Sequence, residues 1–146
     1  MDEPVVLVVD DSPTVRKIVQ LTLQRAHMQV LTAADGLSAL AAVADASPDL
    51  ILLDIMLPRM DGYNICQVIR KNLAYRDLPI IMLSGKDGIF DKMRGKLAGS
   101  SDYITKPFDS SDLVPTVKRY LSAPAVRERI AQRSAQRQMQ EQLRWR

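Results

Sequence analysis

Short apolar runs, each bounded by turn-forming residues, recur along the whole chain. The first is VVLVV at residues 5–9, and its uninterrupted apolar character is typical of a strand buried on both faces of a sheet. Similar runs follow it, so that strands are predicted at 5–9, 29–33, 50–54, 79–83 and 102–105. The chain therefore supplies five candidate strands.

The segments between these runs have apolar residues at helical spacing. In the segment 12–26, Ser12 is placed to cap a helix and Pro13 suits its first position. Gly95 weakens the helical pattern of the segment that contains it. Helices are predicted at 12–26, 36–46, 62–73, 90–99 and 111–121.

Regular alternation of strand and helix predicts the fold class. Parallel strands joined by helical crossovers form an α/β structure with helices on both faces of the sheet. We therefore predict a single doubly wound, five-stranded parallel sheet of the flavodoxin-like order 2-1-3-4-5.

The polar residues that end the strands fall on one edge of such a sheet. Asp10 and Asp11 end the first strand, Asp54 the third, Ser84 the fourth and Lys106 the fifth. Doubly wound sheets bind ligands at the carboxyl ends of their strands, near the point where the strand order reverses. Because the first and third strands are neighbours in the predicted order, the carboxylates are expected to meet in one pocket.

A pocket of several carboxylates needs a cation, because like charges raise one another's pKa. Oxygen ligands without His or Cys favour Mg²⁺ over zinc. Mg²⁺ held in this way commonly binds a phosphate oxygen as well, so phosphoryl transfer is the leading hypothesis. A carboxylate would form an acyl phosphate, while Lys106 and Ser84 contact the phosphoryl oxygens.

Composition is that of an ordinary globular protein. The 146 residues, 47% of them hydrophobic, suit one domain. No apolar run approaches the ~20 residues of a membrane span, and the start MDEP lacks the basic character of a secretory signal. The lone Cys66 cannot form an internal disulfide. A cytoplasmic location is expected.

The net charge of +3 is unevenly distributed. Residues 1–126 carry 14 Lys and Arg against 15 Asp and Glu, whereas 127–146 carry six Arg and two Glu. We predict a compact unit at 1–122 followed by a basic, Arg- and Gln-rich extension at 123–146, helical or flexible, either solvated or docked on a partner. The extension is too short for a separate output domain that reads DNA. Nucleic acid is therefore not an expected partner, although a dedicated basic binding segment remains the alternative.

Four motifs resemble a known family: VVDDSPT, DLILLDIMLPRMDGY, IIMLSGKDG and SDYITKPF, in this order and spacing, are similar to the receiver domain of bacterial two-component response regulators. The resemblance covers about residues 4–121. It implies that Asp54 accepts a phosphoryl group from a CheA-like histidine kinase and that the chain then changes its contacts with a downstream protein. The stretch from MLSGKDG to ITKPF is closer still to receivers of type IV pilus chemosensory systems, which govern twitching motility and, in cyanobacteria, phototaxis.

The same resemblance implies roles for single residues. It implies that the carboxylates of Asp10, Asp11 and Asp54 bind Mg²⁺. The backbone carbonyl of Met56 is implied to be a further ligand. Ser84 is then the switch hydroxyl, Lys106 the phosphoryl-binding lysine and Tyr103 the switch aromatic. The Lys106-Pro107 bond is implied to be cis. Phosphorylation would draw Ser84 inward and let Tyr103 turn in, which reshapes the surface of the fourth helix, fifth strand and fifth helix.

Other interpretations stay open. A Mg²⁺-dependent phosphatase would carry Asp-x-Asp, but Met56 stands in the place of the second acid. A scaffold without phosphorylation has no use for a crowded acidic pocket, and a phosphate sink would differ only in its downstream role. Tyr103 is alternatively a core aromatic with its hydroxyl at the surface, and a homodimer is possible. The chain is expected to assist its own phosphorylation and dephosphorylation without being an enzyme, and Met56 and Lys86 are hypothesised to alter the phosphoryl lifetime.

Overall fold

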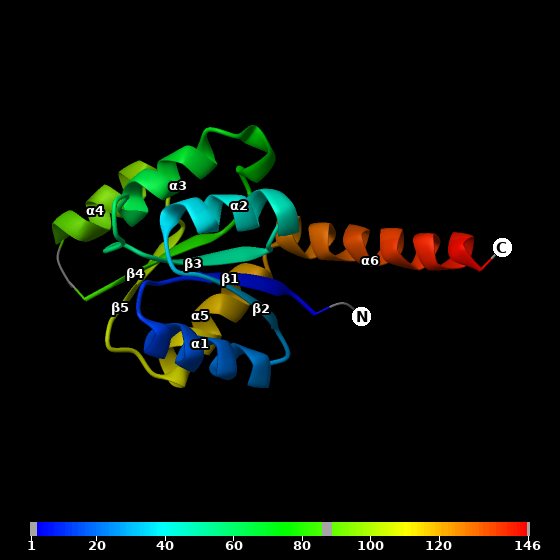
Figure 1. The fold of residues 1–146 in the computed structure, drawn as a ribbon, viewed down its shortest axis with the longest axis horizontal. Helices are drawn as coiled ribbons and strands as arrows, with labels where there is room; N and C mark the ends of the chain where they lie inside the picture. Colours follow the sequence, from blue (N-terminus) through cyan, green and yellow to red (C-terminus); the bar gives the residue numbers. More distant parts are fainter. Residues whose placement is uncertain (1–2, 86–88, 146) are drawn as a thin grey trace.

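The strands form one parallel sheet in the order β2-β1-β3-β4-β5, as predicted. The structure, a computed structural model, describes residues 3–85 and 89–145 (Figure 1). The strands are β1 Val5–Val9, β2 Gln29–Ala33, β3 Leu50–Asp54, β4 Ile80–Ser84 and β5 Asp102–Thr105. Only β4 begins later than predicted, at Ile80, because Pro79 has no N–H to donate to the ladder.

Helices cover both faces of the sheet. The helices are α1 Pro13–Arg25, α2 Gly36–Ala46, α3 Gly62–Arg70, α4 Ile89–Ala98, α5 Ser110–Leu121 and α6 Pro124–Arg144, with a short 3₁₀ helix η1 at Leu73–Tyr75. In Figure 1, α1 and α5 lie on one face and α2, α3 and α4 on the other. The predicted third helix ends early, at Arg70, because Asn72 accepts a hydrogen bond from the backbone N–H of Ala74 and caps η1 instead.

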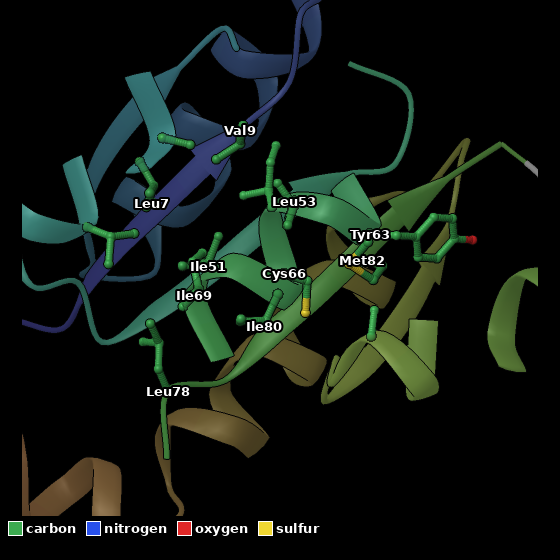
Figure 2. Packing of buried hydrophobic residues seen from close by; sticks show 14 of the residues in the cluster. Leu7, Val9, Ile51, Leu53, Tyr63, Cys66, Ile69, Leu78, Ile80 and Met82 are labelled. Carbon is green, nitrogen blue, oxygen red and sulfur yellow. The ribbon is translucent and has the colours of Figure 1, made fainter. Parts of the chain in front are cut away.

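The hydrophobic core consists of two clusters, one on each face of the sheet. Leu7 and Val9 of β1 point into the cluster that α2 and α3 cover, together with Cys66 (Figure 2). Val6 and Val8 point into the opposite cluster, beneath α1 and α5. Since β3 and β4 are buried along their whole length, the strand ends that carry polar residues have a rigid support.

The C-terminal extension is helical. Its helix α6 begins beside the domain, where Val126 is buried, and then projects beyond the sheet (Figure 1). Arg133 forms a bidentate pair with the carboxylate of Asp49, with both N–O distances at 2.8 Å. No helix in the described ranges is long and apolar enough to span a membrane.

Candidate functional site

The carboxyl ends of β1 and β3 bring three carboxylates together. Asp10, Asp11 and Asp54 each offer an oxygen, and these oxygens all lie within 4.8 Å of one another. Asp10 and Asp54 are buried, with 0% and 5% of their surface exposed, whereas Asp11 is exposed. The group is therefore accessible to solvent at Asp11.

Asp10 is fixed by the tight connection between β1 and α1. Its Oδ1 accepts a hydrogen bond of 2.9 Å from the backbone N–H of Ser12, and its carbonyl accepts one of 2.6 Å from Arg16 Nη1. Ser12 in turn caps α1 by accepting from the N–H of Val15, as predicted. Arg16 was missed from the sequence, because nothing in the pattern of α1 separates it from the other basic residues there.

Asp54 is held by the turn that follows β3. Its Oδ1 accepts a hydrogen bond of 3.1 Å from the backbone N–H of Met56. The chain then returns so closely that a Cβ on Gly62 would overlap the carbonyl oxygen of Asp54 and lie 2.9 Å from Cα of Ile55. Glycine is required at the start of α3 for this reason, and the close packing fixes the end of β3.

Lys106 joins the two buried acids. Its Nζ lies 2.6 Å from Oδ2 of Asp10 and 3.3 Å from Oδ2 of Asp54. Its backbone N–H donates to the carbonyl of Ser84, which ties the end of β5 to the end of β4. The Lys106-Pro107 bond is cis, as the family resemblance implied.

The electrostatics of the site reflect this shared cation. Burial raises the pKa of Asp54, and the neighbouring charge of Asp10 raises it further, while Lys106 acts in the opposite direction. Burial works to lower the pKa of Lys106, but the hydrogen bond to Asp10 and the charge of Asp54 outweigh it, so the net shift is upward. Lys106 therefore stays a cation, and it offsets only part of the effect of burial and of Asp10 on Asp54.

The remaining predicted residues lie on the same part of the sheet. Ser84 is buried at the end of β4 and is paired in register with Thr105 of β5. Tyr103 is half-buried, and its hydroxyl is buried without a hydrogen-bond partner in the part of the chain that the structure describes. The side chain of Met56 is 69% exposed. Lys86 lies outside the described residues.

This donor set suits a hard divalent cation. All side-chain donors of the group are carboxylate oxygens, which Mg²⁺ and Ca²⁺ prefer and zinc does not. A carboxylate beside a cation and a lysine is also placed to act as a nucleophile toward an electrophilic phosphorus. The arrangement therefore fits metal-assisted phosphoryl transfer to an aspartate.

Comparisons with known proteins agree with this chemistry. Residues 6–118 match the response regulator receiver domain. The chain is 46% identical over 116 residues to protein PilG of Pseudomonas aeruginosa, covering 80% of this chain and 86% of PilG. It is 38% identical to the DNA-binding dual master transcriptional regulator RpaA of Synechocystis, but spans only 49% of that relative's length. The structure of chemotaxis response regulator CheY4 of Vibrio cholerae matches 82% of this chain and 99% of its own, with a TM-score of 0.78 and 38% identity.

Proposed function

Because this chain belongs to the family of response regulator receiver domains, we propose that it is a phosphate-accepting switch in which a histidine kinase phosphorylates Asp54. The observation that carries this proposal is the position of the Asp54 carboxylate. It is buried at the end of β3, within 4.8 Å of oxygens of two other acids and 3.3 Å from Lys106. A carboxylate in this position is presented to an incoming phosphoryl group with a cation beside it.

In the proposed reaction an oxygen of Asp54 attacks the phosphorus of a phosphohistidine. An O–P bond forms, the N–P bond breaks, and the imidazole leaves with the electron pair. Lys106 offsets the negative charge on the phosphoryl oxygens, and Ser84 donates a hydrogen bond to one of them. The chain thereby assists its own phosphorylation. In dephosphorylation, water attacks the same phosphorus, the bond to the Asp54 oxygen breaks, and inorganic phosphate leaves while the carboxylate is restored.

The Mg²⁺ ligands are proposed to be the carboxylates of Asp10, Asp11 and Asp54 and the backbone carbonyl of Met56. The oxygen-only donor set supports this choice. When bound, the ion supplies positive charge that offsets the acids and the phosphoryl group. Nζ of Lys106 lies 2.6 Å from Oδ2 of Asp10, so Lys106 and a bound ion would share the negative charge of this carboxylate.

The proposed switch uses Ser84 and Tyr103. Movement of Ser84 toward the phosphoryl group makes room for Tyr103 to turn inward, which changes the surface of α4, β5 and α5. The buried hydroxyl of Tyr103 supports a movable ring, because a hydroxyl without a partner is unfavourable where it lies. A downstream protein is proposed to bind this surface.

The similarity to PilG supports a place in the control of type IV pilus motility or taxis, downstream of a chemotaxis-type histidine kinase in the cytoplasm. Residues 1–122 are proposed to be the receiver unit and 123–146 its extension. No nucleic-acid contact is proposed, since residues 1–126 have nearly balanced charges. A role as a phosphate sink would use the same chemistry with no downstream partner.

Beryllofluoride, which mimics a phosphoryl group on a carboxylate, tests the site without a kinase. Fluorine NMR is expected to show a bound signal only when Mg²⁺ is present, and Asp54→Asn is expected to abolish it. Asp77→Asn is the matched control, because Asp77 is an exposed acid that pairs with Arg76. No bound signal in the wild type, or an equal one in Asp54→Asn, would favour a scaffold that is not phosphorylated.

A further inference from the structure

The distal half of α6 is exposed on all sides. Every side chain from Ala135 to Trp145 is exposed, and this part of the helix projects away from the domain in Figure 1. The attached half of α6 supplies the helical nucleus, so the distal half extends from it without packing contacts of its own in the described domain. Its apolar side chains are therefore available to another surface.

The attached half of α6 fixes which face is turned outward. Val126 is buried, Ile130 packs against the core cluster beneath α5, and Arg133 pairs with Asp49. Arg129 adds a hydrogen bond of 3.3 Å to the carbonyl of Ser47. These residues recur at spacings of three and four, so they define one face, which is turned toward the domain.

A row of four residues runs along the opposite side of the helix. The α6 row consists of Ala131, Ala135, Met139 and Leu143, each four positions after the last. All four are exposed, Met139 by 64% and Leu143 by 62%. Large apolar side chains at these positions have no packing role within the described domain.

None of the four residues in the row is charged. Glutamines 132, 136, 138, 140 and 142 flank it, and the charged Arg127 and Glu128 adjoin only its first residue, Ala131. Arg137 and Arg144 lie on the side of the helix that faces the domain. An acidic protein or a nucleic acid would approach the arginines and not this row. An uncharged, glutamine-lined apolar row is suited instead to a surface like itself.

We infer that the α6 row binds the α6 row of a second copy of this chain, with the two helices antiparallel across a two-fold axis. In that arrangement Ala131 faces Leu143 of the other copy, and Ala135 faces its Met139. Each small alanine thus lies opposite a large side chain. This pairing lets the ridge formed by residues four positions apart on one helix pack against the same ridge of the other helix. No like charges are brought together across the axis. This inference does not depend on phosphorylation of Asp54.

The dimer is expected to be weak. The row spans roughly 18 Å at 1.5 Å per residue, and two such rows bury less than the ~1,200 Å² of a standard stable interface. Association in the micromolar range or weaker is therefore expected, and it depends on protein concentration.

Sedimentation equilibrium on the full chain from low micromolar to several hundred micromolar tests the surface. The wild type is expected to dimerise as its concentration rises, and Met139→Glu to weaken the dimer at least tenfold by placing a charge in the row. Arg144→Glu, which introduces the same side chain on the side of α6 that faces the domain, is expected to behave as the wild type, and circular dichroism checks that all three are folded. A wild type that is monomeric throughout, or a Met139→Glu variant that dimerises equally, would overturn the proposal.

Cysteine cross-linking tests the antiparallel register. Ala135→Cys and Met139→Cys chains mixed under oxidising conditions are expected to form mainly the mixed disulfide, because these positions face each other only in the antiparallel pair. The native Cys66 is buried, and the wild type, which has no other cysteine, gives the background level of cross-linking through it. Homodimers of each variant in place of the mixed species would indicate a parallel pair and contradict the assignment.

Discussion

Lys106 neutralises two buried acids from different strands with one ammonium group. Its shorter contact is to Asp10, at 2.6 Å, and its longer one is to Asp54, at 3.3 Å. Burying Asp10 without this partner would cost several kcal/mol by the usual order of magnitude. Lys106 therefore stabilises the acids of the site, and its positive charge would oppose that of a metal ion bound beside them.

Replacement of Lys106 by methionine is expected to tighten Mg²⁺ binding several-fold at low ionic strength. The variant loses the cation that competes for Asp10 and leaves the site more negative. Isothermal titration calorimetry measures the affinity, and Lys96→Met, an exposed lysine on α4, serves as the control. Unchanged or weaker binding in Lys106→Met would show that the lysine does not compete with the metal.

At the scale of single elements, the connections between strands and helices depend on a few polar groups. Arg70, the last residue of α3, donates to the carbonyls of Gly99, Tyr75 and Leu78 at 2.6 to 2.8 Å. It thereby joins α3 to η1, to the start of β4 and to the turn before β5. Burial lowers the pKa of Arg70, but the carbonyls satisfy its guanidinium.

Arg70→Ala is expected to lower the free energy of unfolding by about 2–3 kcal/mol, because the partly buried carbonyls lose their donor. Urea denaturation measures this change. Arg76→Ala is the control, since that side chain is 75% exposed and pairs with its neighbour Asp77 at the long distance of 3.7 Å. Equal stability of the two variants would mean that the carbonyls of Gly99, Tyr75 and Leu78 accept hydrogen bonds from other donors when Arg70 is absent.

The start of α5 is expected to be sensitive to acid. Asp109 caps α5, and its pKa lies below the ordinary 3.8 because Ser111 and the N–H of Asp112 donate to its carboxylate. A lowered pKa means that the stabilisation is present above the ordinary carboxyl range and is lost as the pH falls through the lowered value. Asp109→Ala is therefore expected to lower the melting temperature by a few degrees at pH 7. The difference from wild type should narrow in strong acid, and a constant difference would contradict the role of the ionised carboxylate.

The elements were largely predictable, because each prediction used a local pattern. Uninterrupted apolar runs located β1 and the other buried strands, and the crossover rules then placed Asp10, Asp54 and Lys106 at one edge of the sheet. Arg16 and Arg70 were not predictable in the same way, because each donates to backbone carbonyls, and a carbonyl leaves no signal in the sequence. The early end of α3 was also missed. Asn72 accepts a hydrogen bond from the backbone N–H of Ala74 and so favours η1 over another turn of α3, but the apolar spacing of the sequence does not reveal this bond.

On the scale of the whole molecule, α6 is anchored at the edge of the sheet opposite the acidic group. Asp49 precedes β3, and its buried carboxylate accepts from Arg133 and from the backbone N–H of Val5. Asp49 and Arg133 are separated by 84 residues in the sequence, so no local sequence pattern predicts that they pair. The helix is thus attached to the same unit that carries Asp54, at its far end.

Arg133→Gln is expected to reduce the free energy of unfolding by about 2 kcal/mol or more, because Asp49 keeps a buried charge without its main partner. Arg144→Gln, the same change at an exposed position of α6, is expected to have no effect. Thermal denaturation compares the two, and in the double variant Asp49→Asn/Arg133→Gln the loss should be smaller than the sum of the single changes. Additive losses would show that the pair is not coupled.

The central claim is that Asp54 is a Mg²⁺-dependent phosphoacceptor, and intact-mass spectrometry after treatment with acetyl phosphate tests it most directly. The wild type is expected to gain one phosphoryl group with Mg²⁺ and none with a chelator, and Asp54→Ala is expected to gain none under either condition. A wild type that stays unmodified where another receiver domain is labelled, or an Asp54→Ala chain that is labelled equally, would contradict the assignment of Asp54.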